Sequence, residues 1–133
     1  METKELILGS IVACKNYEGP CKITHIGAVS GFLVQYGKNY EKPYHQLDLS
    51  PIPLTEEMIG KNFEKHCIPS DGVNPRLEYY EYKDEELRVV VTVCDTIRVQ
   101  AKGADLIIDK KIRYINELQN IFFVLGIRKE FVL

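Results

Sequence analysis

Residues 87–94 read LRVVVTVC, the densest run of β-branched side chains in the chain. Such side chains favour strands because they pack well on a pleated surface. We therefore predict a strand at 87–94, preceded by a strand at 76–82. Further strands are expected at 96–101 and 105–109, with Lys102-Gly103 as the turn between them. Consecutive strands joined by short turns predict an antiparallel β-meander.

Two helices are expected around this meander. Apolar residues recur at helical spacing near the C-terminal end, at Ile115, Leu118, Ile121, Phe122 and Leu125. Gly126 follows them and can adopt the left-handed conformation that ends a helix. An earlier, short helix is expected after Thr55, whose hydroxyl can cap the free N–H groups of the first turn. Gly60 lies inside this second segment and limits it to two or three turns, because glycine destabilises helix interiors.

The N-terminal part of the chain has the pattern of a small all-β unit. Short strands are predicted at 10–14, 21–26, 32–36 and 44–49, separated by Gly- and Pro-containing turns. Roughly 45 residues with four or five strands match the scale of an SH3-like barrel.

The expected fold class is α+β, with an N-terminal SH3-like small β-barrel followed by an antiparallel β-meander with two helices. Prolines at 51 and 53 mark the joint, because proline stops a sheet and holds the chain extended. The expected domains are therefore 1–52, the barrel, and 53–133, an α+β unit packed against it. The C-terminal helix is expected on the meander, and residues 127–133 on the sheet edge.

Composition limits the possible functions. The chain has 133 residues, of which 45% are hydrophobic and 27% charged, an ordinary globular balance. The net charge of −2 argues against a strongly basic nucleic-acid surface and a polybasic membrane surface. No apolar run approaches the ~18 residues of a membrane-spanning helix, and the N-terminus lacks a secretory pattern. We expect a cytoplasmic protein with no membrane partner and with its four cysteines as free, buried thiols.

Chemistry-bearing residues do not form a catalytic or metal-binding motif. A zinc site from Cys14, Cys21 and His25 is not expected, because Cys21 and His25 would lie about 13 Å apart on one strand. We therefore expect no metal, no cofactor and no catalytic residues. The alternative is a small enzyme, with a site assembled from His45, His66, Cys67 and Asp95.

Aromatic and basic residues in the turns and edges of the first half suggest a binding surface instead. They are Tyr17, Tyr36, Tyr40, Tyr44, Lys38 and Lys42. Small barrels bind peptides or nucleic acid through aromatic loops of this kind, so the expected partner is a protein or a nucleic acid. The alternative is that these rings cover a small core. A second basic patch, Lys110 to Arg113, is read as solvated.

Self-association is a third possibility. Phe123 and Val124 widen the apolar stripe of the C-terminal helix beyond one face. A helix of this kind either packs on two sides or contributes to a contact between copies of the chain. The sequence therefore leaves open a homo-oligomer formed through this helix.

Three segments resemble a family of small uncharacterised proteins from gut Bacteroidetes, often associated with phages and mobile elements. PIPLTEEM at 51–58 resembles their PIPLTEEWL segment, and YINELQNIFFVL at 114–125 is similar to their YVHELQNLYFAL. KELILGSIV at 4–12 resembles their ELRIGNIV start. Asn116 stands where relatives have His, which argues against a catalytic imidazole there. The resemblance implies a bacterial, prophage-encoded cytoplasmic accessory protein and carries no activity.

Overall fold

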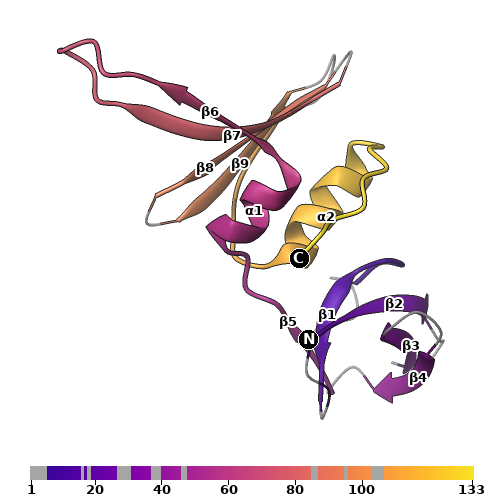
Figure 1. The fold of residues 1–133 in the computed structure, drawn as a ribbon. Helices are drawn as coiled ribbons and strands as arrows, with labels where there is room; N and C mark the ends of the chain where they lie inside the picture. Colours follow the sequence, from indigo (N-terminus) through magenta and orange to yellow (C-terminus); the bar gives the residue numbers. More distant parts are fainter. Residues whose placement is uncertain are drawn as a thin grey trace. The chain divides into compact units, whose positions relative to one another are not determined.

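The computed structural model describes residues 6–15, 17, 19–26, 31–36, 40–45, 48–84, 87–94, 96–102 and 107–133; for His25, 31–36 and 40–45 it describes the backbone alone. The first five strands, β1 to β5, are Ile11–Cys14, Pro20–Ile26, Gly31–Tyr36, Tyr40–His45 and Leu49–Pro51. The next five, β6 to β10, are Glu64–Ile68, Leu77–Lys83, Arg88–Val93, Ile97–Lys102 and Ile107–Ile112. The helices are α1, Glu56–Asn62, and α2, Ile115–Val124 (Figure 1). The expected α+β class is confirmed.

The first sheet is antiparallel throughout and has the order β4-β3-β2-β1-β5. The described residues form this five-stranded sheet and no closed barrel, so the expected SH3-like barrel stays a prediction. The predicted strand 44–49 is two strands instead. Tyr44 pairs with Phe32 on β3, whereas Leu49 pairs with Cys14 on β1, and one continuous strand cannot serve both neighbours.

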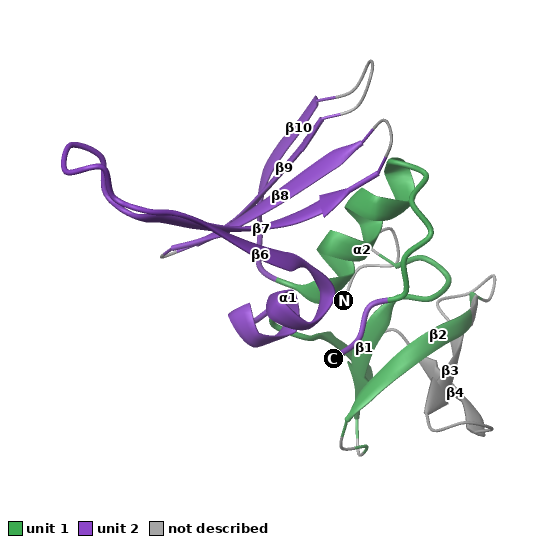
Figure 2. Cartoon of the chain, turned by 45° about the horizontal axis from the view of Figure 1, so that its top comes forward, with its two compact units in different colours: residues 1–53, 114–130 green, residues 54–113, 131–133 purple. Residues whose placement is uncertain are grey.

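The chain divides into two compact units (Figure 2). Unit 1 contains residues 1–53 and 114–130, and unit 2 contains residues 54–113 and 131–133. This division differs from the expected 1–52 and 53–133, because α2 belongs with the first sheet. The difference has a physical basis in a side chain of α2 that bonds the backbone of unit 1.

That side chain is Gln119. Its Oε1 accepts a hydrogen bond from the Ile11 backbone N–H at 2.8 Å, and its Nε2 donates to the Gly9 carbonyl at 2.8 Å. One side of the helix is buried and includes Ile115, Leu118 and Phe122. Buried apolar residues of the strands and the N-terminal segment form a further cluster, consisting of Leu6, Val12, Cys14, Cys21, Ile23 and Leu49.

Unit 2 contains the second antiparallel sheet, of order β10-β9-β8-β7-β6, and helix α1. Thr55 caps α1 as expected, because its Oγ1 accepts from the Met58 N–H at 3.3 Å. The Tyr80 hydroxyl on β7 donates to Glu56 of α1 at 2.9 Å and ties the helix to the sheet. The C-terminal residues 131–133 join this unit, where the Asn62 side chain bonds both backbone groups of Val132 at 2.7 Å. The expected final strand at 127–133 is absent; those residues form neither helix nor strand.

Candidate nucleic-acid interface

The second sheet has one buried face and one open face. Successive residues of a strand point to opposite faces. Val89, Val91 and Val99 are fully buried, so they define the buried face. The strand register then assigns the alternate residues to the other side, which we call the outer face. Its members are Glu64, His66, Ile68, Leu77, Tyr79, Glu81, Lys83, Arg88, Val90, Thr92, Arg98, Gln100, Lys102, Ile107, Asp109 and Lys111.

Cations outnumber carboxylates on the outer face. The cations are Lys83, Arg88, Arg98, Lys102 and Lys111, and all five are exposed. The carboxylates are Glu64, Glu81 and Asp109. The whole chain has a net charge of −2, so this face carries a sign opposite to that of the molecule. The charge is segregated by the alternation of strand residues.

Three pairs of cations stand directly opposite each other across neighbouring strands. Arg88 on β8 lies between Lys83 on β7 and Lys102 on β9. Arg98 on β9 lies opposite Lys111 on β10. Like charges in directly opposed positions destabilise a sheet. An anionic ligand on this face would relieve that repulsion.

Two of the cations are partly neutralised within the sheet. Arg88 Nε lies 2.6 Å from a carboxylate oxygen of Glu81. Arg98 binds both carboxylate oxygens of Asp109, at 2.5 and 2.8 Å. Hydrogen bonds from these guanidinium groups lower the pKa of Glu81 and of Asp109, so both carboxyls stay ionised.

The three lysines of the outer face are not neutralised in this way. Within the ranges that the structure describes, Lys83, Lys102 and Lys111 have no ion-paired carboxylate. Their ammonium groups remain available to an anion from outside the chain.

An aromatic pair lies on the same face, at the β6 edge. The rings of His66 on β6 and Tyr79 on β7 stack with 5.3 Å between centroids and 14° between planes. The next cross-strand pair on this face is Ile68 with Leu77, and these side chains are 51% and 50% exposed. The β6 edge of the outer face is therefore aromatic and apolar beyond Glu64. The cations lie on β7 to β10, in rows on either side of the row that contains Glu81 and Asp109.

These four residues belong to a two-stranded arm. The pairing of β7 with β8 begins at Tyr80, whereas β6 and β7 stay paired as far as Ile68 and Leu77. We call residues 66–79 the β6–β7 arm; it extends beyond the other strands of the sheet (Figure 1). At its tip, Asp71 accepts hydrogen bonds from the backbone N–H groups of Val73 and Asn74. These bonds hold the pKa of Asp71 at about 2, below its ordinary value.

The other side of the arm is occupied by its own ion pairs. Glu78 lies 3.4 Å from the Lys65 ammonium and 2.9 Å from the Arg76 guanidinium. Arg76 Nε also donates to the Cys67 sulfur at 3.0 Å. Polar groups on this side therefore satisfy one another, which leaves the outer face as the side of the arm with exposed apolar surface.

Most of the residues predicted to form a binding surface in the first half of the chain have side chains that the structure does not describe. Tyr17 is half-buried and packs against the cluster of unit 1, as expected of a ring that covers a core. The side chains of Tyr36, Tyr40, Tyr44 and Lys42, and all of Lys38, lie outside the described residues. The proposed aromatic surface therefore stays a prediction.

The described side chains of the alternative enzyme site do not converge. His66 and Cys67 are neighbours on β6 and point to opposite faces, where His66 stacks on Tyr79 and Cys67 contacts Arg76. The side chain of His45, and all of Asp95, lie outside the described residues. Within the described part of the chain, no cluster of three or more His, Cys, Asp or Glu side chains is arranged to hold a metal ion.

The cysteines correct part of the sequence analysis. Cys14 and Cys21 are buried, as expected, but Cys67 and Cys94 are exposed. An apolar sequence neighbourhood did not indicate burial for Cys67, because β6 is an edge strand exposed on both sides.

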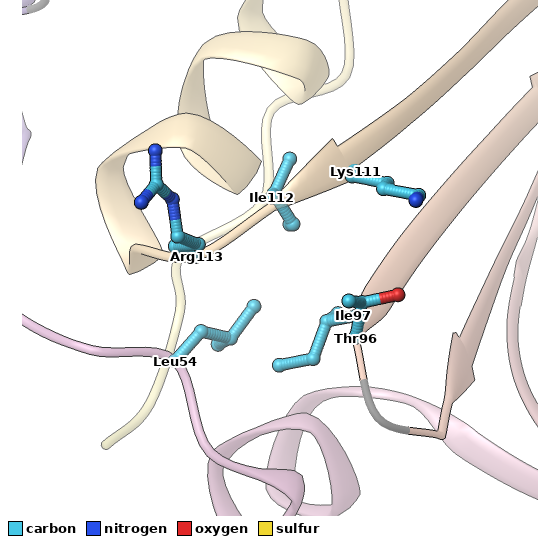
Figure 3. Close-up of a pocket in the computed structure, with 6 residues that line it drawn as sticks. All are labelled: Leu54, Thr96, Ile97, Lys111, Ile112 and Arg113. Atoms are coloured by element: carbon cyan, nitrogen blue, oxygen red, sulfur yellow. The ribbon is translucent and has the colours of Figure 1, made fainter.

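A pocket of about 530 Å³ also lies in unit 2, and Lys111 of the outer face is one of its lining residues. Its lining residues are Leu54, Thr96, Ile97, Lys111, Ile112 and Arg113. Figure 3 shows the Leu54 and Ile97 side chains directed into one space, whereas the charged ends of Lys111 and Arg113 point away from it. Ligand pockets usually place a few polar groups toward the ligand to fix its orientation. This pocket lacks that convergence among its lining residues, so the outer face is the stronger candidate site.

Sequence reasoning missed the outer face, although part of its signal is present in the sequence. Residues 97–102, IRVQAK, alternate apolar with polar, which places Arg98, Gln100 and Lys102 together. The net charge of the chain hides this pattern because acids elsewhere outweigh these cations. The strand register, which aligns Arg88 with Lys102, was needed to find the opposed pairs.

Comparison with known proteins adds no assignment. No family model, no curated protein and no solved structure matches the chain. Among the described residues, neither helix has the length and apolar character needed to cross a membrane.

Proposed function

We propose that this protein is a non-catalytic binding module that binds the phosphate backbone of a nucleic acid through the outer face of its second sheet. The observation that carries the proposal is the group of exposed cations on this open face, of which Lys83, Lys102 and Lys111 have no carboxylate partner among the described residues. Arg88 and Arg98, which lie opposite these lysines, are already paired with carboxylates, so the lysines would be the main phosphate contacts.

The arrangement suits a backbone ligand better than a single small anion. The cations are distributed over four strands, β7 to β10, and neighbouring strands lie about 4.8 Å apart. A chain of phosphates can contact several of them together, and each contact releases bound counterions. The negative charge of the rest of the molecule would keep a nucleic acid on this face.

Salt dependence tests the proposal. In fluorescence anisotropy with a labelled oligonucleotide, log K should fall linearly with log salt, by about 0.7 for each phosphate contact to a single strand. Lys102→Gln and Lys111→Gln should each weaken binding and reduce that slope by about one contact. Lys22→Gln is the matched control, because Lys22 is exposed on β2 of the first sheet and should leave both quantities unchanged.

Two results would reject the function. One is the absence of binding by the unmodified protein at low salt. The other is an equal loss of binding in Lys22→Gln and Lys102→Gln, since binding would then not depend on the outer face.

Three earlier expectations remain part of the proposal. The aromatic surface of the N-terminal sheet, including Tyr36 and Tyr44, would be a second binding surface of SH3-like type. The resemblance to Bacteroidetes proteins supports a cytoplasmic accessory role linked to prophages or mobile elements. Exposed Phe123 and Val124 on α2 keep self-association a prediction, which light scattering at high protein concentration would test.

A further inference from the structure

We infer that the nucleic acid bound by the outer face is single-stranded, and that one of its unpaired bases stacks on His66 at the sheet edge. This inference rests on the proposed function and specifies its ligand. It places a base-binding position in the β6–β7 arm, on the same face as the cations that would hold the backbone.

The geometry of the aromatic pair supplies the first step. Tyr79 covers one face of the His66 ring, with the two planes only 14° apart. β6 is the last strand of its sheet, so the other face of the imidazole points past the edge, where the described residues place no further strand. The His66 side chain is 35% exposed. The Glu64 carboxylate lies 3.9 Å from the ring's Nε2, and a third flat ring would extend the existing stack on the face away from Tyr79.

The neighbours of this position favour a nucleobase as the third ring. Ile68 and Leu77 lie beside the stack on the same face and are half exposed, so they offer apolar contact to a base or a sugar. The Arg88 guanidinium lies against the Glu81 carboxylate, which is the main cause of its raised pKa, and it also interacts with the Tyr79 side chain. The outer face therefore offers aromatic, apolar and cationic groups to the base, sugar and phosphate of a nucleotide, with the Glu64–Glu81 pair between the aromatic pair and Lys83.

A duplex does not fit this position. Its bases are already stacked on one another, and extracting one costs a few kcal/mol. A single strand presents unstacked bases, and base–aromatic stacking tolerates any sequence because every base has a π-face. The outer face would thus distinguish single strands from duplexes by stacking, while its cations attract both.

Three ligands and two variants test the inference with the full chain. The ligands are a thymidine oligonucleotide of about 12 nucleotides, a duplex of equal length, and inorganic polyphosphate, which has the charge without the bases. His66→Ala should weaken binding of the single strand about tenfold and leave its salt slope unchanged. His66→Phe should keep the affinity, because phenylalanine retains a stacking surface. Neither variant should change binding of polyphosphate, which also shows that both are folded.

The outcomes separate the two proposals. If the unmodified protein binds neither the oligonucleotide nor polyphosphate, the proposed function fails. If it binds both but His66→Ala leaves single-strand affinity unchanged, or the duplex binds as tightly as the single strand, the function stands and the stacking position is wrong. If His66→Ala weakens polyphosphate to the same extent, the residue acts through charge or folding, and stacking is likewise rejected.

Discussion

Two amide side chains hold backbone segments that are far apart in the sequence. Gln119 bonds the N–H of Ile11 and the carbonyl of Gly9, and Asn62 bonds both backbone groups of Val132. Asn62 Nδ2 also donates to the Met58 carbonyl at 2.7 Å. An amide suits this task because it offers a donor and an acceptor together. Each side chain thus supplies the hydrogen-bond partners of backbone groups in a distant segment.

Replacing Gln119 should therefore lower the stability of the protein. Gln119→Met keeps the volume but leaves the Ile11 N–H and the Gly9 carbonyl without their partner, at a cost of about 2 kcal/mol. Denaturant unfolding would measure the change. Lys22→Met, at an exposed position of β2, should change the free energy of unfolding by less than about 0.5 kcal/mol. Equal effects of the two substitutions would contradict the role assigned to Gln119.

The cysteines should differ in reactivity. Burial, with the Cys21 side chain as a hydrogen-bond partner, raises the pKa of Cys14 to about 12, and burial also raises the pKa of Cys21. The thiolate is the reactive form, so a disulfide reagent at pH 8 should modify the two exposed thiols, Cys67 and Cys94, in the folded protein. All four should react after unfolding. Rapid reaction of three or four thiols in the folded protein would show that Cys14 or Cys21 is accessible.

The same pKa shift makes stability depend on alkaline pH. The folded pKa of Cys14 lies above the ordinary thiol value of 9.0, so the unfolded chain releases this proton first as the pH rises. The free energy of unfolding should be unaffected by Cys14 below about pH 9 and should fall between about pH 9 and 12. Cys14→Ala should reduce this decrease, as urea titrations at several pH values would show.

Among the elements, the helices were the most predictable from sequence. The apolar spacing from Ile115 onward, the Thr55 cap and Gly126 each depend on neighbours within a few residues. The structure agrees at all three, and Gly126 has a φ of +73° in the left-handed region. Local sequence was enough for these features.

Strand β6 could not be predicted in the same way. Its sequence, EKHCI, has no clear alternation, and it is a strand because it pairs with β7 across a loop. Strand β10 likewise lies at 107–112 where 105–109 was expected, because its register is set by β9. The candidate site depends on these long-range pairings, so its opposed cations were beyond sequence reasoning.

The hydroxyl of Thr55 that caps α1 should contribute measurably to stability. Thr55→Ala removes the acceptor for the Met58 N–H and should destabilise the protein by about 1 kcal/mol, measured by thermal unfolding. Thr55→Ser, which keeps the hydroxyl, should remain close to the unmodified protein. A similar loss in both variants would assign the effect to the methyl group of Thr55 instead.

At the scale of the whole molecule, the chain passes repeatedly between its two units. It leaves unit 1 after residue 53, returns at 114 and leaves again after 130. The first two passages lie side by side, since Pro53 and Tyr114 form an antiparallel bridge and the Ile115 N–H donates to the Ile52 carbonyl at 3.0 Å. The sequence could not reveal this, because the joint at 51–53 looks like a single boundary between consecutive domains.

Unit 1 should therefore fold without unit 2 if its two segments are joined. A chain of residues 1–53, an Asn-Gly turn and residues 114–130 keeps α2 and the Gln119 bonds, because the bridge places the joined ends close together. Its amide NMR spectrum should be dispersed. Residues 1–53 alone lack α2 and should give the spectrum of an unfolded chain. A folded spectrum for 1–53 alone would show that the first sheet does not need the helix.

The repeated passage between units also determines what a protease cut would do. Cleavage after Pro53 leaves one fragment with the first sheet and another with α2, which completes unit 1. Neither product is a finished domain, so the nicked halves should stay associated and co-elute until denaturant separates them. The joint thus offers a site for splitting the protein into two fragments that reassemble.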